Sequence, residues 1–328
     1  MAKELNSDQQ GENGTSSVAA GEEQPFRAGF VALVGKPNSG KSTLLNAYLG
    51  ERIAIVSQTP QTTRTVIRGV LTLSEAQIVF LDTPGIHNPV HHLGQYMVAA
   101  ATRTIEDADV VVFLVDLSAP PDAEDRLIAD LLREKCRVPL IVALNKGDTV
   151  ADRAAAGRPY LDLLTDAAGQ PRYDAAITLS ALQAWGRYEL LQAIVGRLPE
   201  SPPYYPDDYL TDQPRRVIAA ELVREQILRF TWHEIPHAVA VVVEEFKERS
   251  PELTYISAYI YVEKETQKKI ILGSKGQLLR KIGQAARQEI EAFLGTRVYL
   301  DLWVKVRKKW RKRPGALRWL GYDISKLD

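Results

Sequence analysis

Residues 35–42 read Gly35-Lys36-Pro37-Asn38-Ser39-Gly40-Lys41-Ser42 and follow a short apolar run at 30–34. A glycine, four residues and then Gly-Lys-Ser is the spacing of a phosphate-binding loop between a buried strand and a helix. Glycines let the backbone approach a phosphate closely, and the amides at the helix start supply positive potential. We expect the loop and Thr43 to bind a nucleotide, with Lys41 at the β- and γ-phosphates and the Ser42 hydroxyl on Mg²⁺.

Further apolar runs occupy residues 78–81, 110–115, 140–144 and 177–179, each bounded by Gly, Asp or Pro. Continuous runs of this length are typical of strands buried on both faces, and the amphipathic stretches between them indicate helices. We therefore expect an α/β fold with a mostly parallel sheet covered by helices on both faces. Ligands bind such sheets at the carboxyl ends of the strands.

Asp82, Thr83, Pro84 and Gly85 end the run at 78–81, where they would meet the phosphate loop. We expect Asp82 to hold Mg²⁺ through water, and the Gly85 amide to sense a γ-phosphate, because glycine can approach it closely. Taken alone, the tetrapeptide is equally well explained as a turn at the end of a strand.

Two more loops follow predicted strands and suit a guanine base. Asp148, after the run at 140–144, carries a carboxylate that can accept hydrogen bonds from guanine N1 and its exocyclic amine, donors that adenine lacks in that arrangement. We expect Asn145 to bind the other edge of the base and brace the loops, and Lys146 to lay its stem across the ring. Backbone amides after the run at 177–179 would face the guanine carbonyl at Ser180, Ala181 and Leu182.

The four motifs, in this order and each at a strand end, disfavour a kinase or an adenine-specific ATPase. An RNA-binding structural subunit with a degenerate nucleotide domain is another alternative. Such a subunit would be expected to lack Lys41, Asp82 or Asp148, and all three are present.

These residues resemble the Era family of small GTPases. Residues 58–64, Gln-Thr-Pro-Gln-Thr-Thr-Arg, are similar to its first switch, in which a threonine closes on Mg²⁺ and the γ-phosphate; we favour Thr63 over Thr62. The resemblance makes Asn38, Lys41, Thr63 and Gly85 the catalytic set. Asn38 resembles a residue that helps bind K⁺ in related GTPases, although it could instead satisfy its own loop. Ile86 stands where Ras-like enzymes carry a water-orienting Gln, so hydrolysis should be slow.

Charge is divided unevenly along the 328 residues. Residues 265–328 hold 16 Lys and Arg against 6 Asp and Glu, which leaves 25 basic and 35 acidic residues for the rest. The net charge of zero thus conceals an acidic body and a basic C-terminal region, which suits a nucleic-acid partner. The lone Cys136 excludes a disulfide framework and a cysteine-rich zinc site.

Composition divides the chain into four parts. Residues 1–25 are a polar leader that we expect to be disordered, without a signal peptide, because it has few large apolar side chains. Residues 26–198 form the GTPase domain, and 199–214 are an acidic, proline-rich linker. In the second domain, 215–328, we expect helices at 219–230 and 277–294, strands at 238–246, 254–262 and 298–306, and a turn at 270–276.

Gly273-Ser274-Lys275-Gly276 precedes the helix predicted at 277–294. A Gly-x-x-Gly loop clamps a nucleic-acid backbone in KH domains, and the helix start would direct its positive end at the phosphates. Alone the tetrapeptide is more often a turn. The cations around this one favour the clamp: Lys268, Lys269, Lys275, Arg280 and Lys281.

The last predicted strand adds a second basic element. Alternation puts Trp303, Lys305 and Arg307 on one face, and residues 307–313 then set Trp310 among six cations that include Lys308, Lys309 and Arg311. Bases can stack on tryptophan while cations hold phosphates, so we expect single-stranded RNA here. A solvated basic face or a contact with anionic lipid is the competing interpretation.

Residues 224–230 and 302–306 also resemble the Era family, and the resemblance covers about residues 26–321. It implies a type II KH domain that binds 16S rRNA near its 3′ end, assistance in maturation of the small ribosomal subunit, and GTP hydrolysis to GDP with Mg²⁺. It also implies a cytoplasmic monomer with peripheral contact to the inner face of the plasma membrane. The alternative function is a membrane-surface regulatory GTPase that uses its basic tail for lipid contact.

Overall fold

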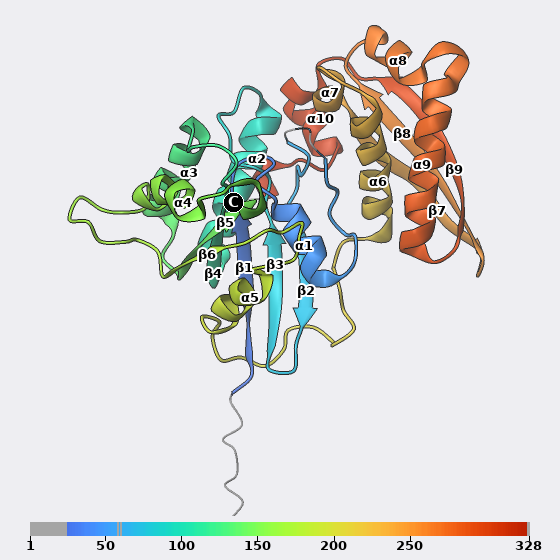
Figure 1. Ribbon diagram of the computed structural model, residues 1–328. Coiled ribbons are helices and arrows are strands. Elements are labelled where there is room, and N and C mark those ends of the chain that lie inside the picture. The colour runs from blue at the N-terminus through green and yellow to red at the C-terminus, as the bar shows by residue number, and fades with distance from the viewer. Residues whose placement is uncertain (1–24, 58, 60, 327–328) are drawn as a thin grey trace, which may run out of the picture.

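The computed structural model describes residues 25–57, 59 and 61–326. These residues form two sheets, each with its own helices, as Figure 1 shows. The predicted disordered leader, apart from Pro25, lies outside the described residues. Within the described ranges, no helix combines the length and the apolar composition that a membrane span requires.

The first sheet has six strands in the order β2-β3-β1-β4-β5-β6. All neighbours are parallel except β2, which runs antiparallel to β3. The mostly parallel sheet is thus confirmed, but β2 was not predicted, because its half-buried residues form no continuous apolar run. The strands are β1 (Arg27–Val34), β2 (Ile67–Thr72), β3 (Ala76–Asp82), β4 (Val110–Asp116), β5 (Leu140–Asn145) and β6 (Ala175–Thr178).

Helices cover both faces of this sheet, as the apolar strands require. One face packs against α1 (Lys41–Leu49) and α5 (Arg187–Val195), and the other packs against α2 (His92–Asp107), α3 (Ala123–Lys135) and α4 (Arg153–Asp162). A short 3₁₀ turn, η1 (Gly147–Thr149), follows β5. The carboxyl ends of the parallel strands therefore share one edge, between the two helical layers.

The segment predicted as a linker packs along the sheet. Backbone N–H of Val70 donates to the carbonyl of Leu210 at 2.8 Å, and Gln77 Nε2 donates to the carbonyl of Tyr205 at 2.8 Å. The stacked rings of Tyr205 and Tyr209 lie against Val70 and its neighbours on β3. Residues 199–214 thus add a covering layer at the β2–β3 side of the sheet.

The second sheet has the order β7-β8-β9, with β7 antiparallel and β9 parallel to β8. Apart from the one-turn helix α7, the order αββααβ is that of the expected type II KH domain. We expected a turn at 270–276, but α8 continues to Leu272 and only 273–276 turn, with η2 (Ser274–Gly276) in the loop. The elements are α6 (Arg215–Phe230), α7 (Ile235–Ala238), β7 (Ala240–Ser250), β8 (Leu253–Val262), α8 (Glu265–Leu272), α9 (Gln277–Leu294) and β9 (Arg297–Val306).

The C-terminal segment joins the two domains. It contains η3 (Trp310–Lys312), α10 (Pro314–Trp319) and η4 (Ile324–Lys326). Trp310 is fully buried, packs in one cluster with Leu93 and Met97 of α2, and donates its indole N–H to the carbonyl of Ala238 at 2.9 Å. The expectation that bases stack on Trp310 is therefore wrong. Arg311, predicted to contact phosphates, instead pairs with Glu263 at 2.6 Å.

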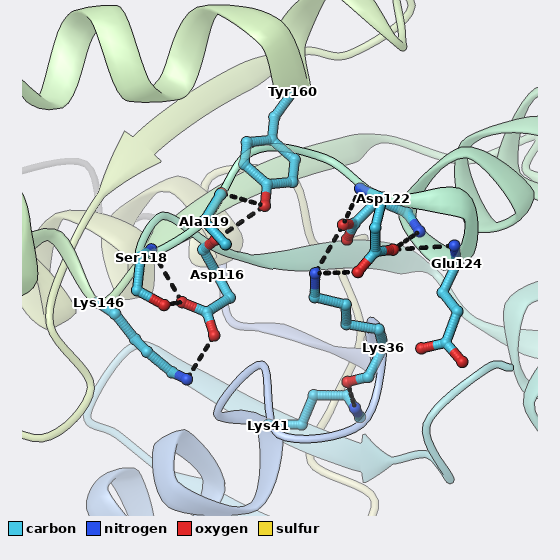
Figure 2. A network of polar contacts seen from close by, with 10 residues as sticks. Lys36, Lys41, Asp116, Ser118, Ala119, Asp122, Glu124, Lys146 and Tyr160 are labelled. Atoms are coloured by element: carbon cyan, nitrogen blue, oxygen red, sulfur yellow. Dashed lines mark hydrogen bonds and ion pairs between the residues drawn. The ribbon is translucent and has the colours of Figure 1, made fainter. Parts of the chain in front are cut away.

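A partly buried lysine, Lys36, ties the phosphate loop to α3 (Figure 2). Lys36 Nζ lies 2.7 Å from Asp125 Oδ2 and 2.9 Å from Asp122 Oδ2, and Asp122 also caps α3. Burial disfavours the ammonium, but hydrogen bonds to Asp125 and Asp122 outweigh it, so the pKa of Lys36 is raised. The carbonyl of Lys36 in turn accepts from Lys41 Nζ at 2.9 Å. Anchoring Lys36 to α3 thereby also orients Lys41.

Replacing Lys36 tests this anchor. Lys36→Met keeps the apolar stem but leaves the fully buried Asp125 without a counter-ion, so the free energy of unfolding should fall by about 3 kcal/mol. Lys36→Arg keeps a cation beside Asp125 and should retain most of the wild-type stability. The control Lys135→Met removes a half-exposed pair with Glu106 and should cost less than about 1 kcal/mol. Urea unfolding measures both, and equal losses would contradict the anchoring role.

Candidate functional site

A cavity of about 560 Å³ lies at the carboxyl edge of the six-stranded sheet. Residues from the phosphate loop and from the loops after β3, β5 and β6 converge on it. The predicted residues that line it are Pro37, Asn38, Gly40, Lys41, Ser42, Thr43, Thr63, Gly85, Asn145, Lys146, Asp148, Ser180, Ala181 and Leu182. The residues predicted to contact nucleotide that do not line it are Gly35, Lys36, Ser39, Asp82, Thr83 and Pro84.

Sequence reasoning missed part of the lining. Ile55, Val56, Ser57 and Thr149 also face the cavity. For residues 55–57, the only signal in the sequence is their position just before the predicted first switch. Two of them also contact the second domain: Ile55 packs in its core, and the backbone N–H of Val56 donates to Glu225 of its first helix at 3.0 Å.

Two glycines let the loops meet. Gly40 has φ +104°, and a Cβ there would lie 2.2 Å from Asn145 Nδ2. A Cβ on Gly85 would lie 2.6 Å from the backbone N of Pro37. Larger residues at either position would push the phosphate loop away from the strand ends that complete the cavity.

Two opposite charges are buried at the phosphate end of the cavity. Burial lowers the pKa of Lys41 to about 8, with Asp82 partly offsetting it, and raises the pKa of Asp82 to about 6 against the opposing effects of Lys41, Ser42 and Thr63. Both side chains are buried, so their interaction with a bound ion would be only weakly screened by solvent.

Oxygen atoms converge beside Asp82. Ser42 Oγ donates to Asp82 Oδ2 at 2.6 Å, and Thr63 Oγ1 lies 3.0 Å from Ser42 Oγ. Asp82 Oδ1 is buried and has no hydrogen-bond partner among the described residues. Hydroxyl and carboxylate oxygens with an unsatisfied acceptor suit Mg²⁺. The Thr62 hydroxyl points elsewhere, donating to the carbonyl of Thr59 at 2.6 Å.

Asn145 braces the base end of the cavity. Its Nδ2 donates to the carbonyl of Ser39 at 2.8 Å, and its Oδ1 accepts from the backbone N–H of Ala181 at 2.9 Å. Lys146 Nζ pairs with Asp116 at 2.5 Å (Figure 2), a residue at the end of β4 that the motifs did not reveal. The loops that present Lys146, Asp148 and Ala181 are thereby fixed relative to the phosphate loop.

The first switch is held by the second domain. Arg64 donates to the carbonyls of Val239 at 2.6 Å and Pro236 at 3.1 Å. The buried Arg224 of α6 donates to the carbonyl of Thr62. The only sign of these interdomain contacts in the sequence is that Arg64 directly follows Thr63. Residues 62 and 64 therefore touch the second domain while residue 63 faces Ser42.

A second cavity, also about 560 Å³, runs between α9 and β9 from the predicted clamp. Gly276 opens it, and Arg280, Gly283 and Arg287 line it along one face of α9. Gly273 and Gly276 have φ of +68° and +76°, and Ser274 and Lys275 between them are exposed. An exposed loop at a helix start beside two arginines can hold a phosphate backbone.

The other predicted RNA-binding residues lie apart from this groove. The Lys281 ammonium sits 4.4 Å over the ring of Phe230, toward α6. Trp303 and Lys305 point to the face of the sheet away from the helices, and the Arg307 guanidinium lies 4.3 Å over Trp319. Lys308 is exposed beyond the end of β9. The predicted set is thus split between two faces of the domain.

The chain is similar to known proteins along nearly its whole length. Residues 30–146 match the 50S ribosome-binding GTPase family, and 234–311 match the KH domain family. GTPase Era of Caldanaerobacter subterraneus subsp. tengcongensis is 48% identical over 303 residues, 92% of this chain and 99% of that protein. GTPase Era of Geotalea uraniireducens is 45% identical over 301 residues, again 92% and 99% of the two chains.

Solved structures agree. Era in complex with MgGDPNP and nucleotides 1506–1542 of 16S ribosomal RNA is 41% identical, with a TM-score of 0.85 over 91% of this chain and 99% of that one. A variant of Aquifex aeolicus Era bound to GDP and AlF₄⁻ is 40% identical, with a TM-score of 0.84 over 91% and 100%. Identity at this level over both domains settles the family: the chain belongs to the Era GTPases.

Proposed function

We propose that this GTPase binds 16S rRNA near its 3′ end through the second domain, that its nucleotide state governs this engagement, and that it assists maturation of the small ribosomal subunit. One observation carries the proposal: Thr63 Oγ1 lies 3.0 Å from Ser42 Oγ, while the two neighbours of Thr63 contact the second domain. The related Era structure that contains both MgGDPNP and 16S RNA supports the same combination.

The cavity assigns a role to each residue. Lys41 would contact the β- and γ-phosphates. Ser42 and Thr63, with Asp82 through water, would hold Mg²⁺, which would supply electrostatic stabilisation of the transferred phosphoryl group. The Gly85 amide would meet the γ-phosphate. Ile86 is buried and apolar, so it cannot orient the attacking water, and intrinsic hydrolysis should be slow.

We also propose that Asn38 helps hold K⁺ beside the phosphates. Asn38 lines the cavity with Pro37 and Gly85, at the phosphate end. A cation there would offset charge on the phosphates. Hydrolysis should then be faster in K⁺ than in Na⁺ at equal ionic strength, and Asn38→Asp should change that preference. Equal rates in the two salts would remove K⁺ from the proposal and leave the GTPase unaffected.

Guanine selectivity should rest on the carboxylate of Asp148, which lines the cavity. Asp148→Asn turns one acceptor into a donor, which mismatches guanine but suits the carbon-2 oxygen of xanthine. GTP affinity should fall roughly 100-fold or more, with a gain for xanthosine triphosphate. Titration calorimetry measures both, with the exposed Asp162→Asn as control. Undiminished GTP binding would exclude the contact.

The clamp is tested at Gly276, whose Cβ direction opens into free space. Gly276→Asp adds a carboxylate where a phosphate backbone should lie, so affinity for RNA carrying the 3′ end of 16S rRNA should fall roughly 100-fold, with GTP affinity unchanged. Gly295→Asp is the control, since it has a similar φ and free space at the other end of α9. If the two variants bind RNA alike in a filter assay, the loop is only a turn.

We propose that the protein acts in the cytoplasm as a monomer. The basic tail was the feature that suggested a membrane surface, and two of its members are engaged within the protein, Trp310 in the core and Arg311 with Glu263. These contacts weaken the membrane alternative relative to RNA binding.

A further inference from the structure

The outer face of the β7-β8-β9 sheet carries an ordered set of aromatic rings. Parallel pairing sets Tyr255 beside Tyr299 and Tyr259 beside Trp303. The residues that alternate with them, such as Ile256 and Val304, pack in the core under α6 and α9. We call Tyr255, Tyr259, Tyr299 and Trp303 the aromatic sheet face; it lies on the side of the sheet away from those helices.

Two of these rings are exposed, and Tyr255 and Tyr259 are half-buried. Tyr299 is 61% exposed and Trp303 56% exposed, and both belong to β9, the edge strand. The rings of Tyr255 and Tyr299 stack with centroids 5.8 Å apart. Tyr261, the next residue of β8 on this face, is not accessible, because it is buried against Trp319 of α10. The C-terminal segment therefore bounds the face on one side and leaves the rest open.

Positive charge lies directly on the rings. Lys305 Nζ is 3.4 Å from the ring centroid of Tyr259, and the Arg249 guanidinium is 4.2 Å from that of Tyr255. Two acids of this face have partners within the protein: Glu245 pairs with Lys247 at 2.6 Å, and Asp301 accepts from the Trp303 indole N–H at 2.9 Å. The exposed Glu244 lies farther along β7, near Tyr261. Aromatic planes with adjacent cations are the elements that bind single-stranded nucleic acid.

The face continues from the clamp groove across the edge of the sheet. Tyr299 lines the groove between α9 and β9 and also belongs to the aromatic sheet face. No further strand covers β9 within the described residues. A nucleic-acid strand that leaves the groove at Tyr299 would thus reach Tyr255 on β8 and Trp303 farther along β9.

We propose that the aromatic sheet face is a second contact for the same RNA strand, which crosses the β9 edge from the groove and stacks bases on the exposed rings of Tyr299 and Trp303. The inference rests on the proposed RNA binding by the clamp. Cations seated on the rings favour an RNA strand over a protein or a second copy of this chain as the occupant.

Binding of a short and a longer RNA distinguishes this second contact from the clamp. The full-length protein is titrated with a single-stranded RNA of about four nucleotides, the number that a Gly-x-x-Gly loop clamps, and with one of about twelve from the 3′ end of 16S rRNA. Trp303→Ala should weaken the longer RNA about tenfold and change the shorter one less than about twofold. Trp303→Phe, which keeps a stacking plane, should recover most of the affinity. Trp232→Ala, in the loop after α6 and 72% exposed, is the matched control.

Each result has one meaning. If Gly276→Asp weakens both RNAs while Trp303→Ala weakens neither, or weakens both equally, the second contact is refuted and the clamp stands. If neither variant weakens either RNA, the proposed RNA binding itself fails. Sedimentation of the same samples tests whether a second copy of the chain occupies the face instead. If the protein self-associates and Trp303→Ala abolishes this association without changing RNA affinity, the face belongs to a second copy and the inference is overturned. Because Trp303 is more than half exposed, circular dichroism should show an intact fold.

Discussion

The structure depends on a pair of buried, opposite charges at one edge of a parallel sheet. Lys41 and Asp82 are almost completely removed from solvent. Burial lowers the pKa of Lys41 and raises the pKa of Asp82, which favours the neutral form of each group. A triphosphate and Mg²⁺ would satisfy both charges, so much of the surrounding structure can be understood as holding them in place. Lys36 fixes the loop to α3, and Asn145 fixes it to the strand ends on the other side.

The same constraint reaches the second domain through three consecutive residues. Thr63 meets Ser42 in the first domain, whereas the Thr62 carbonyl and the Arg64 guanidinium bind groups of the second. A shift of Thr63 that accompanies exchange of GTP for GDP would have to move or break contacts one residue away. The α2 helix adds a parallel link, because its Leu93 and Met97 share a core with Trp310. Nucleotide and RNA sites are thus joined by packed residues.

The sequence was sufficient for features set by short-range chemistry. The phosphate loop, the strand-end motifs and the helix at 277–294 each depend on local spacing or periodicity, and the structure has the mostly parallel sheet and α9 as expected. It was insufficient where tertiary contacts decide. Trp310 lies in a run of cations yet fills the core between the domains, and Lys36 sits in the phosphate loop yet points to α3. Neither partner is near in sequence. The strand β2 was missed because it carries no continuous apolar run, and α8 was missed because eight residues are too few to show a helical periodicity.

Nucleotide state and RNA binding should be coupled through residues 62–64, and this coupling can be measured. Its most direct test is the affinity for RNA carrying the 3′ end of 16S rRNA, measured with saturating non-hydrolysable GTP analogue and with saturating GDP, together with the two nucleotide affinities in the presence and absence of that RNA. Linkage requires the two ratios to be the same factor, and this account predicts tighter RNA binding with the GTP analogue, by roughly fivefold or more. RNA affinity that is identical in the two nucleotide states would contradict it.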